Sequence, residues 1–491
     1  MSSDKAQSRD AAWRRDLREA MTPRERTAIP RAQMPMLDPA FRIRSNDEVN
    51  QGLSAEQAVT EATRCLDCPD PQCVTGCPVG IDIPGFVKEI QRGDTAAAAA
   101  VLRRTSALPA VCGRVCPQEK QCESRCIYNK MKKAPVAIGW LERFAADTAP
   151  DAPAAAPVER SGERVAVVGS GPAGLSFAGD MARRGYDVTV FEALHEIGGV
   201  LKYGIPEFRL PNRVVEREID ALRAAGVEFR PDTVIGKTLG YDDLLNEGFR
   251  GIFVASGAGL PRFMGIPGEN FINILSSNEY LTRVNLMHAG MPGYATPVPR
   301  GAIVAVVGGG NTAMDSVRTA LRMGASRAML VYRRTRAEMP ARAEEVAHAL
   351  EEGVELMELC NPVEYLADER GRVRAMRVQR MRLGEPDAGG RRRPEPVEGA
   401  VDEIPVDVVV VSVGVSPNPL IPDSIDGLET TQKGTLAVDE ALHTTLGTVY
   451  AGGDIVRGGA TVILAMGDGR RAAASMHAAL CPGGAEEVGQ E

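Results

Sequence analysis

The sequence predicts an α/β protein in which a helical, cysteine-rich domain precedes two domains built on parallel sheets. Eight of the ten cysteines fall between Cys65 and Cys126. Farther along, an apolar run enters a glycine-rich turn twice, at Arg164–Gly174 (RVAVVGSGPAG) and at Ile303–Ala313 (IVAVVGGGNTA), and a helical pattern follows each turn. A strand, a glycine turn and a helix are typical of doubly wound, Rossmann-like sheets. At roughly 150 residues per domain, 491 residues suffice for about three domains.

The composition is that of an ordinary globular protein and excludes several other classes. The 57 Lys and Arg residues against 65 Asp and Glu residues give a net charge of −8, whereas nucleic-acid-binding proteins usually carry a basic excess. No uncharged apolar run approaches the ~18 residues of a membrane helix. The first ten residues are polar and lack the apolar centre of a secretion signal. We therefore expect a cytoplasmic protein with no membrane span and no nucleic-acid partner.

Shifts in composition divide the chain into segments. Charged residues and scattered prolines at the start predict an arm without a core of its own, and APDAPAAAPVERSG predicts a linker. Short helices are expected at Ala55–Arg64 and Ile83–Arg92, and an exposed hairpin loop at Gly384–Glu403. The expected segments are the arm at 1–50, the helical domain at 51–148, the linker at 149–162, a first nucleotide domain at 163–297 and 430–491, and a second at 298–429.

The first glycine turn has the features of a dinucleotide site. Gly169 would make the tight turn, Gly171 would let the backbone approach a pyrophosphate, and Gly174 would let helix and strand pack closely. The start of the following helix offers free N–H groups and a partial positive charge to the phosphates. The next strand ends at Glu192, where a carboxylate can accept hydrogen bonds from a ribose diol. We expect this turn to bind a nucleotide.

The second glycine turn differs in the residues that follow its second strand. Gly308 and Gly310 repeat the first two glycines, with Ala in the third position. Where the first unit has an acidic residue, this one has YRRTR at Tyr332–Arg336. A carboxylate would repel a 2′-phosphate, whereas the guanidinium groups of Arg333 and Arg334 can bind it. This turn is therefore expected to bind NADP(H) in preference to NAD(H).

The clustered cysteines predict iron–sulfur ligation. The first group is Cys65, Cys68, Cys73 and Cys77, and the second is Cys112, Cys116, Cys122 and Cys126. Short, unequal spacings and Pro after Cys77 and Cys116 are typical of ferredoxin-type segments that supply two clusters. Zinc is the alternative, although structural zinc sites usually repeat independent Cys pairs. Eight thiolates could hold two 4Fe–4S clusters.

Some chemistry has no candidate residues. Cys360 and Cys481 are isolated, so no redox cysteine pair of the disulfide reductase kind is expected beside a flavin. No Ser/His/Asp pattern of a hydrolase is present. Hydride transfer requires no protein acid or base, and we therefore assign no catalytic residue.

Longer segments resemble one family. The chain resembles the small (β) subunit of NADPH-dependent glutamate synthase, and with it the N-terminal part of dihydropyrimidine dehydrogenase and the large subunit of the electron-bifurcating ferredoxin:NADP oxidoreductase. The resemblance covers nearly the whole chain from about residue 30. The matching segments are 61–87, 108–126, Gly198–Pro211 (GGVLKYGIPEFRLP), Val306–Asp315 (VVGGGNTAMD), Tyr332–Arg342 and Ala451–Ala473.

The resemblance implies adrenodoxin-reductase-like nucleotide domains, with FAD in the first and NADPH in the second. It implies FAD contacts at Gly169, Gly171, Pro172, Ala173, Gly174, Glu192, Gly199, Leu201, Gly453, Asp454, Thr461 and Val462, and NADPH contacts at Gly308, Gly310, Asn311, Thr312, Arg333 and Arg334. A helix from Ala460–Ala465 would point its positive end at the flavin.

The resemblance also implies two interleaved ligand sets for two 4Fe–4S clusters. One cluster would take Cys65, Cys68, Cys73 and Cys126, and the other Cys77, Cys116, Cys122 and Glu142, which leaves Cys112 without a cluster. From the residues alone, Glu142 is most simply a surface position on a helix, and Cys112 is the more usual ligand type.

The function implied is electron transfer. Electrons would pass from NADPH to FAD, then singly to the clusters, and then to a large glutamate synthase subunit that makes glutamate from glutamine and 2-oxoglutarate. We expect a hetero-oligomer with that partner. The first alternative is the large subunit of a bifurcating NADH-dependent ferredoxin:NADP oxidoreductase, whose partner is a small subunit. The second is an electron-transfer scaffold without dehydrogenase activity, against which the intact second glycine turn argues.

Overall fold

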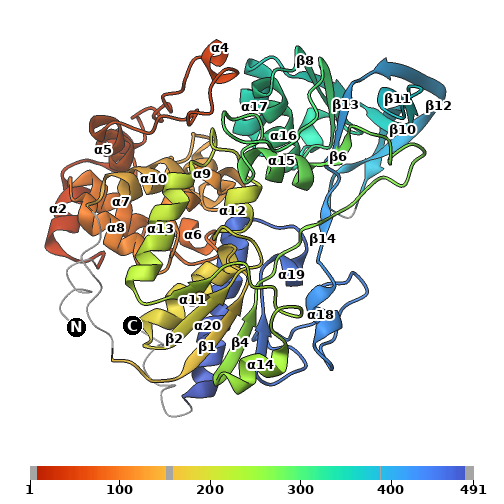
Figure 1. Ribbon diagram of the computed structural model, residues 1–491. Coiled ribbons are helices and arrows are strands. Elements are labelled where there is room, and N and C mark those ends of the chain that lie inside the picture. The colour runs from red at the N-terminus through yellow and green to blue at the C-terminus, as the bar shows by residue number, and fades with distance from the viewer. Residues whose placement is uncertain (1–7, 151–158, 388, 482–491) are drawn as a thin grey trace.

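The computed structural model describes residues 8–150, 159–387 and 389–481. Figure 1 shows a helical N-terminal part lying against one α/β domain, with a second α/β domain connected to the first by two extended segments. The predicted α/β class is therefore confirmed. Most of the expected linker falls at 151–158, outside the described residues. In the described part of the chain, no helix is both long and apolar enough to cross a membrane.

The N-terminal arm and the helical domain consist of short helices. A capping box between Ser54 and Gln57 starts the helix that the sequence predicts at Ala55. The arm holds α2 (Ala12–Glu19), α3 (Pro23–Arg26) and α4 (Pro39–Arg42). The domain holds α5 (Ala55–Thr63), α6 (Gln72–Thr75), α7 (Ile83–Gln91), α8 (Thr95–Arg103), α9 (Pro109–Val115), η1 (Gln118–Lys120), η2 (Glu123–Arg125), η3 (Ile127–Met131) and α10 (Ile138–Thr148). The helices predicted at Ala55–Arg64 and Ile83–Arg92 are confirmed.

The first nucleotide domain is a five-stranded parallel sheet in the order β15-β4-β1-β2-β3. Its strands are β1 (Arg164–Val168), β2 (Asp187–Phe191), β3 (Glu228–Arg230), β4 (Phe249–Val254) and β15 (Val449–Ala451). Its helices are α11 (Pro172–Arg183), α12 (Val200–Tyr203), α13 (Asn212–Ala224), α14 (Tyr241–Asn246), α18 (Leu420–Ser424), α19 (Asp454–Arg457) and α20 (Val462–Leu480). The glycine turns that follow β1 and β15 therefore lie at the carboxyl ends of strands, where open α/β sheets bind ligands.

The second nucleotide domain repeats the arrangement in the order β6-β13-β7-β8-β9. Its strands are β6 (Ile274–Ser276), β7 (Ile303–Val307), β8 (Arg327–Tyr332), β9 (Glu355–Glu358) and β13 (Val408–Val411). Its helices are α15 (Ser277–Asn285), α16 (Asn311–Arg322), η4 (Arg336–Glu338) and α17 (Ala343–Glu351). An antiparallel sheet of β10 (Cys360–Ala367), β11 (Val373–Pro386) and β12 (Arg392–Pro405) is inserted before β13.

The chain passes between the two nucleotide domains at a small antiparallel pair, β5 (Leu260–Pro261) and β14 (Val415–Ser416). The expected boundaries at 297/298 and 429/430 are therefore misplaced. Strand β6 pairs with β13 and belongs to the second sheet. Ile421 and Ile425 pack in the core of the first domain, because their apolar side chains cover Ile252 on β4. Glycines and prolines do mark both crossings, at Gly257–Gly268 and at Gly414–Pro422, and they were the signal that the expected boundaries overlooked.

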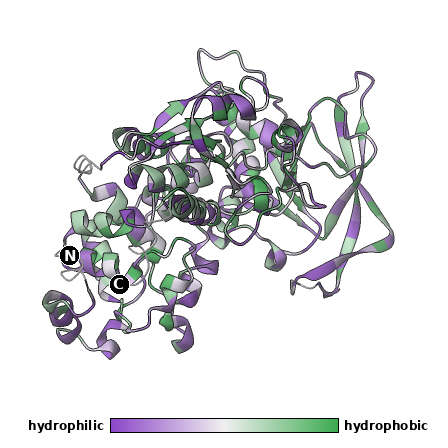
Figure 2. Ribbon diagram, turned by 90° about the horizontal axis from the view of Figure 1, so that it is seen from below, coloured by the Kyte–Doolittle hydropathy of each residue, from purple (hydrophilic) through white to green (hydrophobic). Residues whose placement is uncertain are grey.

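The stretch expected to be an exposed hairpin loop is mostly strand. Residues 384–386 end β11 and residues 392–403 belong to β12, so of the described residues only 387 and 389–391 lie between the two strands. Figure 2 shows the long hairpin extending away from the rest of the molecule. The exposure of this hairpin agrees with the prediction. Its two paired strands were not predicted because its sequence is polar and charged, and the exposed face of a two-stranded ribbon needs few apolar residues.

The arm contacts both the helical domain and the second nucleotide domain. Arg14 pairs with Asp67 in the helical domain at 2.5 Å, and Arg42 pairs with Glu351 on α17 at 2.7 Å. Between the two nucleotide domains, Arg209 pairs with Asp315 on α16 at 2.6 Å, and both residues are buried. The second nucleotide domain is thus connected to the remainder by several charged contacts.

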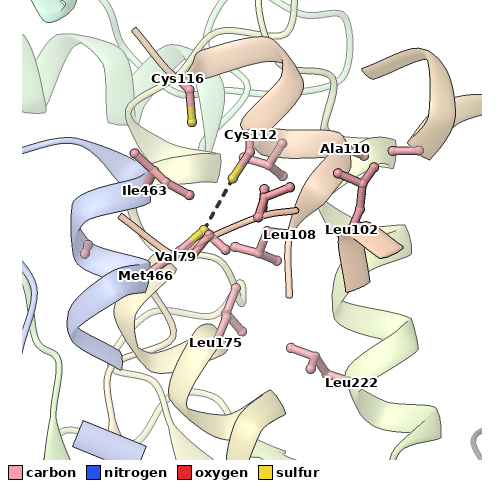
Figure 3. Close-up of a cluster of buried hydrophobic side chains, with 14 of the residues drawn as sticks. Val79, Leu102, Leu108, Ala110, Cys112, Cys116, Leu175, Leu222, Ile463 and Met466 are labelled. Atoms are coloured by element: carbon pink, nitrogen blue, oxygen red, sulfur yellow. Dashed lines mark hydrogen bonds between the residues drawn. The ribbon is translucent and has the colours of Figure 1, made fainter. Parts of the chain in front are cut away.

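In contrast, one continuous apolar core joins the helical domain to the first nucleotide domain. Figure 3 shows Leu108 and Cys112 of the helical domain packing with Leu175 on α11 and Met466 on α20. The cores of the second nucleotide domain are separate clusters. Burial of apolar side chains on both sides of the junction therefore makes the helical domain and the first nucleotide domain one packed unit.

This shared core predicts that a cavity in it destabilises both domains together. Leu175 is fully buried, so Leu175→Ala should lower the stability of the unit by about 2–5 kcal/mol. Denaturation of the full chain followed by circular dichroism measures the change. The matched control is Leu245→Ala on the exposed side of α14, which should cost far less. Equal losses in the two variants would contradict a shared core.

Candidate functional site

The first glycine turn has the backbone that a pyrophosphate requires. Gly169 has φ +104°, and a Cβ atom there would lie 2.5 Å from the Ala255 carbonyl oxygen. A Cβ on Gly174 would overlap the Gly169 carbonyl oxygen, so this glycine lets α11 pack closely against β1. Nothing lies within 4 Å of a Cβ placed on Gly171, the residue before Pro172 starts α11. The open side of Gly171 at a helix start therefore fits a phosphate group.

Glu192 lies where the sequence predicts, at the end of β2, and its carboxylate already has partners. It accepts hydrogen bonds from the Ser170 N–H at 2.9 Å, the Ser170 hydroxyl at 2.5 Å and the Leu194 N–H at 2.9 Å. These bonds fix the carboxylate beside the glycine turn. Since each carboxylate oxygen can accept more than one bond, a ribose diol could still bind.

The segment Gly198–Leu201 forms another wall of this site. A Cβ on Gly199 would lie 3.0 Å from Cα of Gly171, so the two glycines pack backbone to backbone. The Gly198 N–H donates to the Ser170 hydroxyl at 2.9 Å. Leu201 is buried in the shared core and anchors the segment.

The C-terminal Gly-Gly-Asp turn lies against the same site. A Cβ on Gly453 would lie 2.9 Å from Cβ of Ala173, at the start of α11. Asp454 accepts a hydrogen bond from the Ala460 N–H at 3.1 Å, and burial raises its pKa to about 6. Thr461 caps α20 through the Leu464 N–H, so that helix begins at Val462 as the resemblance implies.

Asp468 holds this turn in place, and the sequence reasoning missed it. Its carboxylate accepts from the Gly453 N–H at 3.0 Å and from the Arg457 guanidinium at 2.5 and 2.6 Å. Arg471 donates a further hydrogen bond at 2.7 Å. An acidic residue inside an otherwise apolar helix face was the available signal, because a buried carboxylate needs partners.

The second glycine turn has the same geometry. A Cβ on Gly308 would overlap the Ser412 carbonyl oxygen, whereas Gly310 faces open space before α16. The Asn311 amide oxygen accepts the Arg342 N–H at 2.9 Å, which fixes the side chain of Asn311 beside the turn. Thr312 is exposed at the helix start. The turn therefore also fits a phosphate group.

The two arginines expected at the 2′-phosphate differ in their surroundings. Arg333 is exposed at the end of β8. Arg334 is buried, donates to the Arg392 carbonyl oxygen at 2.7 Å and lies 3.5 Å from Asp387. The guanidinium of Arg334 is therefore already bonded to residues of the β11–β12 hairpin. Of the two arginines, Arg333 has the guanidinium that is open to a ligand.

The cysteines separate into two groups that interact electrostatically within each group. We call Cys65, Cys68, Cys73 and Cys126 the Cys65 set. Burial, and then the charges of Cys65 and Cys126, raises the pKa of Cys68 to about 11. The same causes raise the pKa of Cys73, and burial and Cys65 raise that of Cys126. Four thiolates that repel one another suit a cluster whose irons supply positive charge.

The other group includes a carboxylate. We call Cys77, Cys116, Cys122 and Glu142 the Cys77 set. Burial is the main cause of the raised pKa of Cys77 and of Cys122, and the charge of Glu142 adds to both. Glu142 is only 6% exposed, so its expected surface position is wrong. Burial raises its pKa to about 8, and its Oε1 has no hydrogen-bond partner.

Cys112 borders the Cys77 set from the apolar side. It is buried, and its Sγ lies 3.5 Å from Sδ of Met466, as Figure 3 shows. Cys112 interacts most directly with Cys116, through a hydrogen bond between the two thiols that shifts the pKa of both, and the charges of Glu142 and Cys77 also act on it. The unsatisfied oxygen fits a ligand role for Glu142, because a buried polar atom without a partner is costly.

The Cys77 set also lies next to the first nucleotide domain. A Cβ on Gly467 of α20 would lie 3.0 Å from the carbonyl oxygen of Pro78, the residue after Cys77. The same helix starts beside the Gly-Gly-Asp turn. One helix therefore connects the first nucleotide site to the Cys77 set, and the Cys65 set lies on the side of the arm, where Asp67 pairs with Arg14 and Arg18.

Comparisons with known proteins agree with this architecture. Residues 42–153 match the model for the dihydropyrimidine dehydrogenase domain II, 4Fe-4S cluster, and residues 163–469 match that for the pyridine nucleotide-disulphide oxidoreductases. The chain is 38% identical over 448 residues to the glutamate synthase (NADPH) small chain of Halomonas elongata, with 88% of this chain and 92% of the relative covered. It belongs to the glutamate synthase small-chain family.

Other members and structures delimit what the family implies. The Azospirillum brasilense glutamate synthase (NADPH) small chain is 37% identical over 91% of this chain and 94% of its own length. The β subunit of the NADP(+)-dependent formate dehydrogenase of Moorella thermoacetica is 40% identical over 82% of this chain but only 59% of its own. The structure of Mycobacterium tuberculosis FprA in complex with NADPH has a TM-score of 0.55 and 18% identity over 67% of this chain and 87% of FprA, which shows the fold.

Membership of the small-chain family confirms the predicted oxidoreductase.

The close packing at the first glycine turn predicts that a substitution at Gly174 impairs flavin binding. Gly174→Ala must push α11 away from β1, because the added Cβ would overlap the Gly169 carbonyl oxygen. We expect purified Gly174→Ala to retain much less flavin per chain, measured by absorbance. Gly259→Ala, where a Cβ meets nothing within 4 Å, is the control and should keep its flavin. Full flavin in both variants would contradict the assignment of this turn.

Proposed function

We propose that this chain is the NADPH-oxidising, electron-transferring small subunit of a glutamate synthase. The observation that carries the proposal is the continuity of α20, which starts beside the first nucleotide site and passes Pro78 next to the Cys77 set. A nucleotide site and a set of thiols on one packed unit suit electron transfer between them. The full-length coverage of the glutamate synthase relatives favours this partner over that of the formate dehydrogenase relative.

The chain's residues supply binding and orientation in this proposal. The open glycines 171 and 310 and the helix starts that follow them would hold the pyrophosphates of FAD and NADPH. The Asp468 network would keep the Gly-Gly-Asp turn against the flavin site. When bound, FAD supplies the change from a two-electron hydride to one-electron transfers, which 4Fe–4S clusters require.

The partner is proposed to be a large subunit that releases ammonia from glutamine. Ammonia and 2-oxoglutarate then form 2-iminoglutarate, which the large subunit reduces to glutamate. This chain has no residues assigned to that chemistry and would function in a hetero-oligomer. None of the ten cysteines, all of them within the described residues, forms a disulfide, which suits a cytoplasmic location, where thiols remain reduced. The test is anaerobic addition of NADPH to the isolated chain: flavin bleaching and reduction of an added dye support the proposal, and no reduction contradicts it.

Cofactor preference can be tested with the two arginines. Replacing both Arg333 and Arg334 with Ala should raise the NADPH KM by about tenfold or more, because hydrogen bonds to a charged group contribute about 1.5–3 kcal/mol. The NADH KM should change far less. Because Arg334 also holds the hairpin, Arg333→Ala alone should account for most of the change. The control is the exposed Arg382→Ala on β11. Equal changes for both nucleotides would mean that these arginines do not bind the phosphate.

Two clusters per chain predict about eight iron atoms and eight acid-labile sulfides per FAD in anaerobically prepared protein. Cys112→Ser should keep both clusters, whereas Glu142→Ala should lose or alter the cluster of the Cys77 set. Iron analysis and electron paramagnetic resonance measure both effects. Stoichiometric zinc without sulfide would refute the clusters, and the reverse behaviour of the two variants would assign the ligand role to Cys112.

A further inference from the structure

A buried lysine lies directly behind the Cys65 set. Lys88 on α7 is 0% exposed, and its Nζ donates to the Cys65 carbonyl oxygen at 2.7 Å and to Gln91 Oε1 at 2.6 Å. Both acceptors are neutral. The charge of this ammonium is therefore not cancelled by a carboxylate bonded to it.

The arm adds further positive charge at the same place. Asp67 lies between Cys65 and Cys68 with φ +50°, and its buried carboxylate pairs with two arginines of α2, Arg14 at 2.5 Å and Arg18 at 2.7 Å. Two guanidinium groups therefore lie against the one carboxylate of Asp67 at this place.

Arg26 is a third buried cation on this side. It is buried, and its guanidinium donates to the carbonyl oxygens of Leu17, Met21 and Thr63 and to the Gln91 amide oxygen, all of them neutral. The nearby buried pair of Arg64 and Glu61 cancels its own charge. Lys88 and Arg26 thus place two buried cations with neutral acceptors behind the Cys65 set.

The Cys77 set has the opposite surroundings. Glu142 is buried with Oε1 unpartnered, and Glu218 is buried and accepts from the Ala110 N–H at 2.9 Å. Arg342 and Arg470 bring cations to this side, and each has a carboxylate partner: Glu344 lies 3.0 Å from Arg342 and Asp180 lies 3.3 Å from Arg470. Another buried carboxylate, that of Glu123, is paired with Arg31 at 2.9 Å. The buried carboxyl groups of Glu142 and Glu218 therefore lie beside the Cys77 set without a cation bonded to either of them.

We propose that this charge difference, with Lys88 as its main buried component, gives a cluster on the Cys65 set a higher reduction potential than a cluster on the Cys77 set. Reduction adds one negative charge to a cluster. A buried cation stabilises that charge strongly because the interior screens it weakly, and a buried carboxylate destabilises it. Electrons that enter beside the first nucleotide site would then move downhill from the Cys77 set to the Cys65 set. The inference rests on the proposed function and adds a direction to it.

Lys88 touches the protein backbone behind the cluster site, so its role is electrostatic positioning and not catalysis. A neutral replacement of similar length tests the charge. In anaerobic, iron-replete full-length Lys88→Met, the ratio of reduced to oxidised Cys65-set cluster at a fixed ambient potential should fall about tenfold, which is about 59 mV for a one-electron couple. A dithionite titration with mediators, followed by electron paramagnetic resonance, measures the ratio. Cys116→Ser assigns the signals, because it alters only the Cys77-set cluster.

Further variants test the sign. Asp67→Asn removes a buried negative charge, and Asn tolerates the left-handed backbone at this position, so the Cys65-set potential should rise. Lys88→Arg should retain the wild-type potential. Lys133→Met removes a lysine from the exposed surface of the same domain and should shift neither potential.

The outcomes are separable from those of the proposed function, because dithionite reduces the clusters without NADPH. A potential unchanged in iron-replete Lys88→Met, an equal shift of both clusters, or a wild-type order with the Cys77 set higher would overturn the inference. If Lys88→Met fails to hold its iron, Asp67→Asn decides: a rise supports the inference, and no rise overturns it.

Discussion

The apolar junction between the helical domain and the first nucleotide domain is the interaction on which the rest of the structure depends. Leu108 and Cys112 pack with Leu175 and Met466, so helices that carry thiols and helices that begin at the nucleotide site share one core. Close-packed protein interiors have low compressibility. This core therefore fixes the distance between the nucleotide site and the thiols. Electron transfer between two bound groups requires a scaffold that holds them at a constant distance.

The locally encoded parts of the site were predictable from the sequence. Gly169 and Gly308 lie in turns whose backbone only glycine adopts easily, and each lies between a buried strand and a helix, so pattern and physics coincide. The spacing of the thiols was equally visible.

The remaining features depend on residues distant in sequence. Glu142 is buried because α10 packs on α9, which no property of the helix itself required. The Arg334 guanidinium donates to the carbonyl oxygen of Arg392, 58 positions away. The crossings between nucleotide domains at β5 and β14 pair strands that are far apart in the sequence, and their glycines and prolines do not say which segments pair. Lys88 is buried because the arm and the helices around α7 enclose it, and nothing in its local sequence singled it out. Tertiary contacts, which short-range patterns do not encode, decide each of these cases.

The second nucleotide domain is attached in a different way, by two short paired strands and by charged contacts such as Arg209 with Asp315 and Arg42 with Glu351. Apolar surfaces slide over one another at small cost, whereas ion pairs enclosed away from water are favourable only at one alignment. The ion pairs of the arm and of the domain boundary therefore favour one orientation of the second domain. Moving the domain away from this orientation would separate opposite charges and would not expose an apolar face that promotes aggregation.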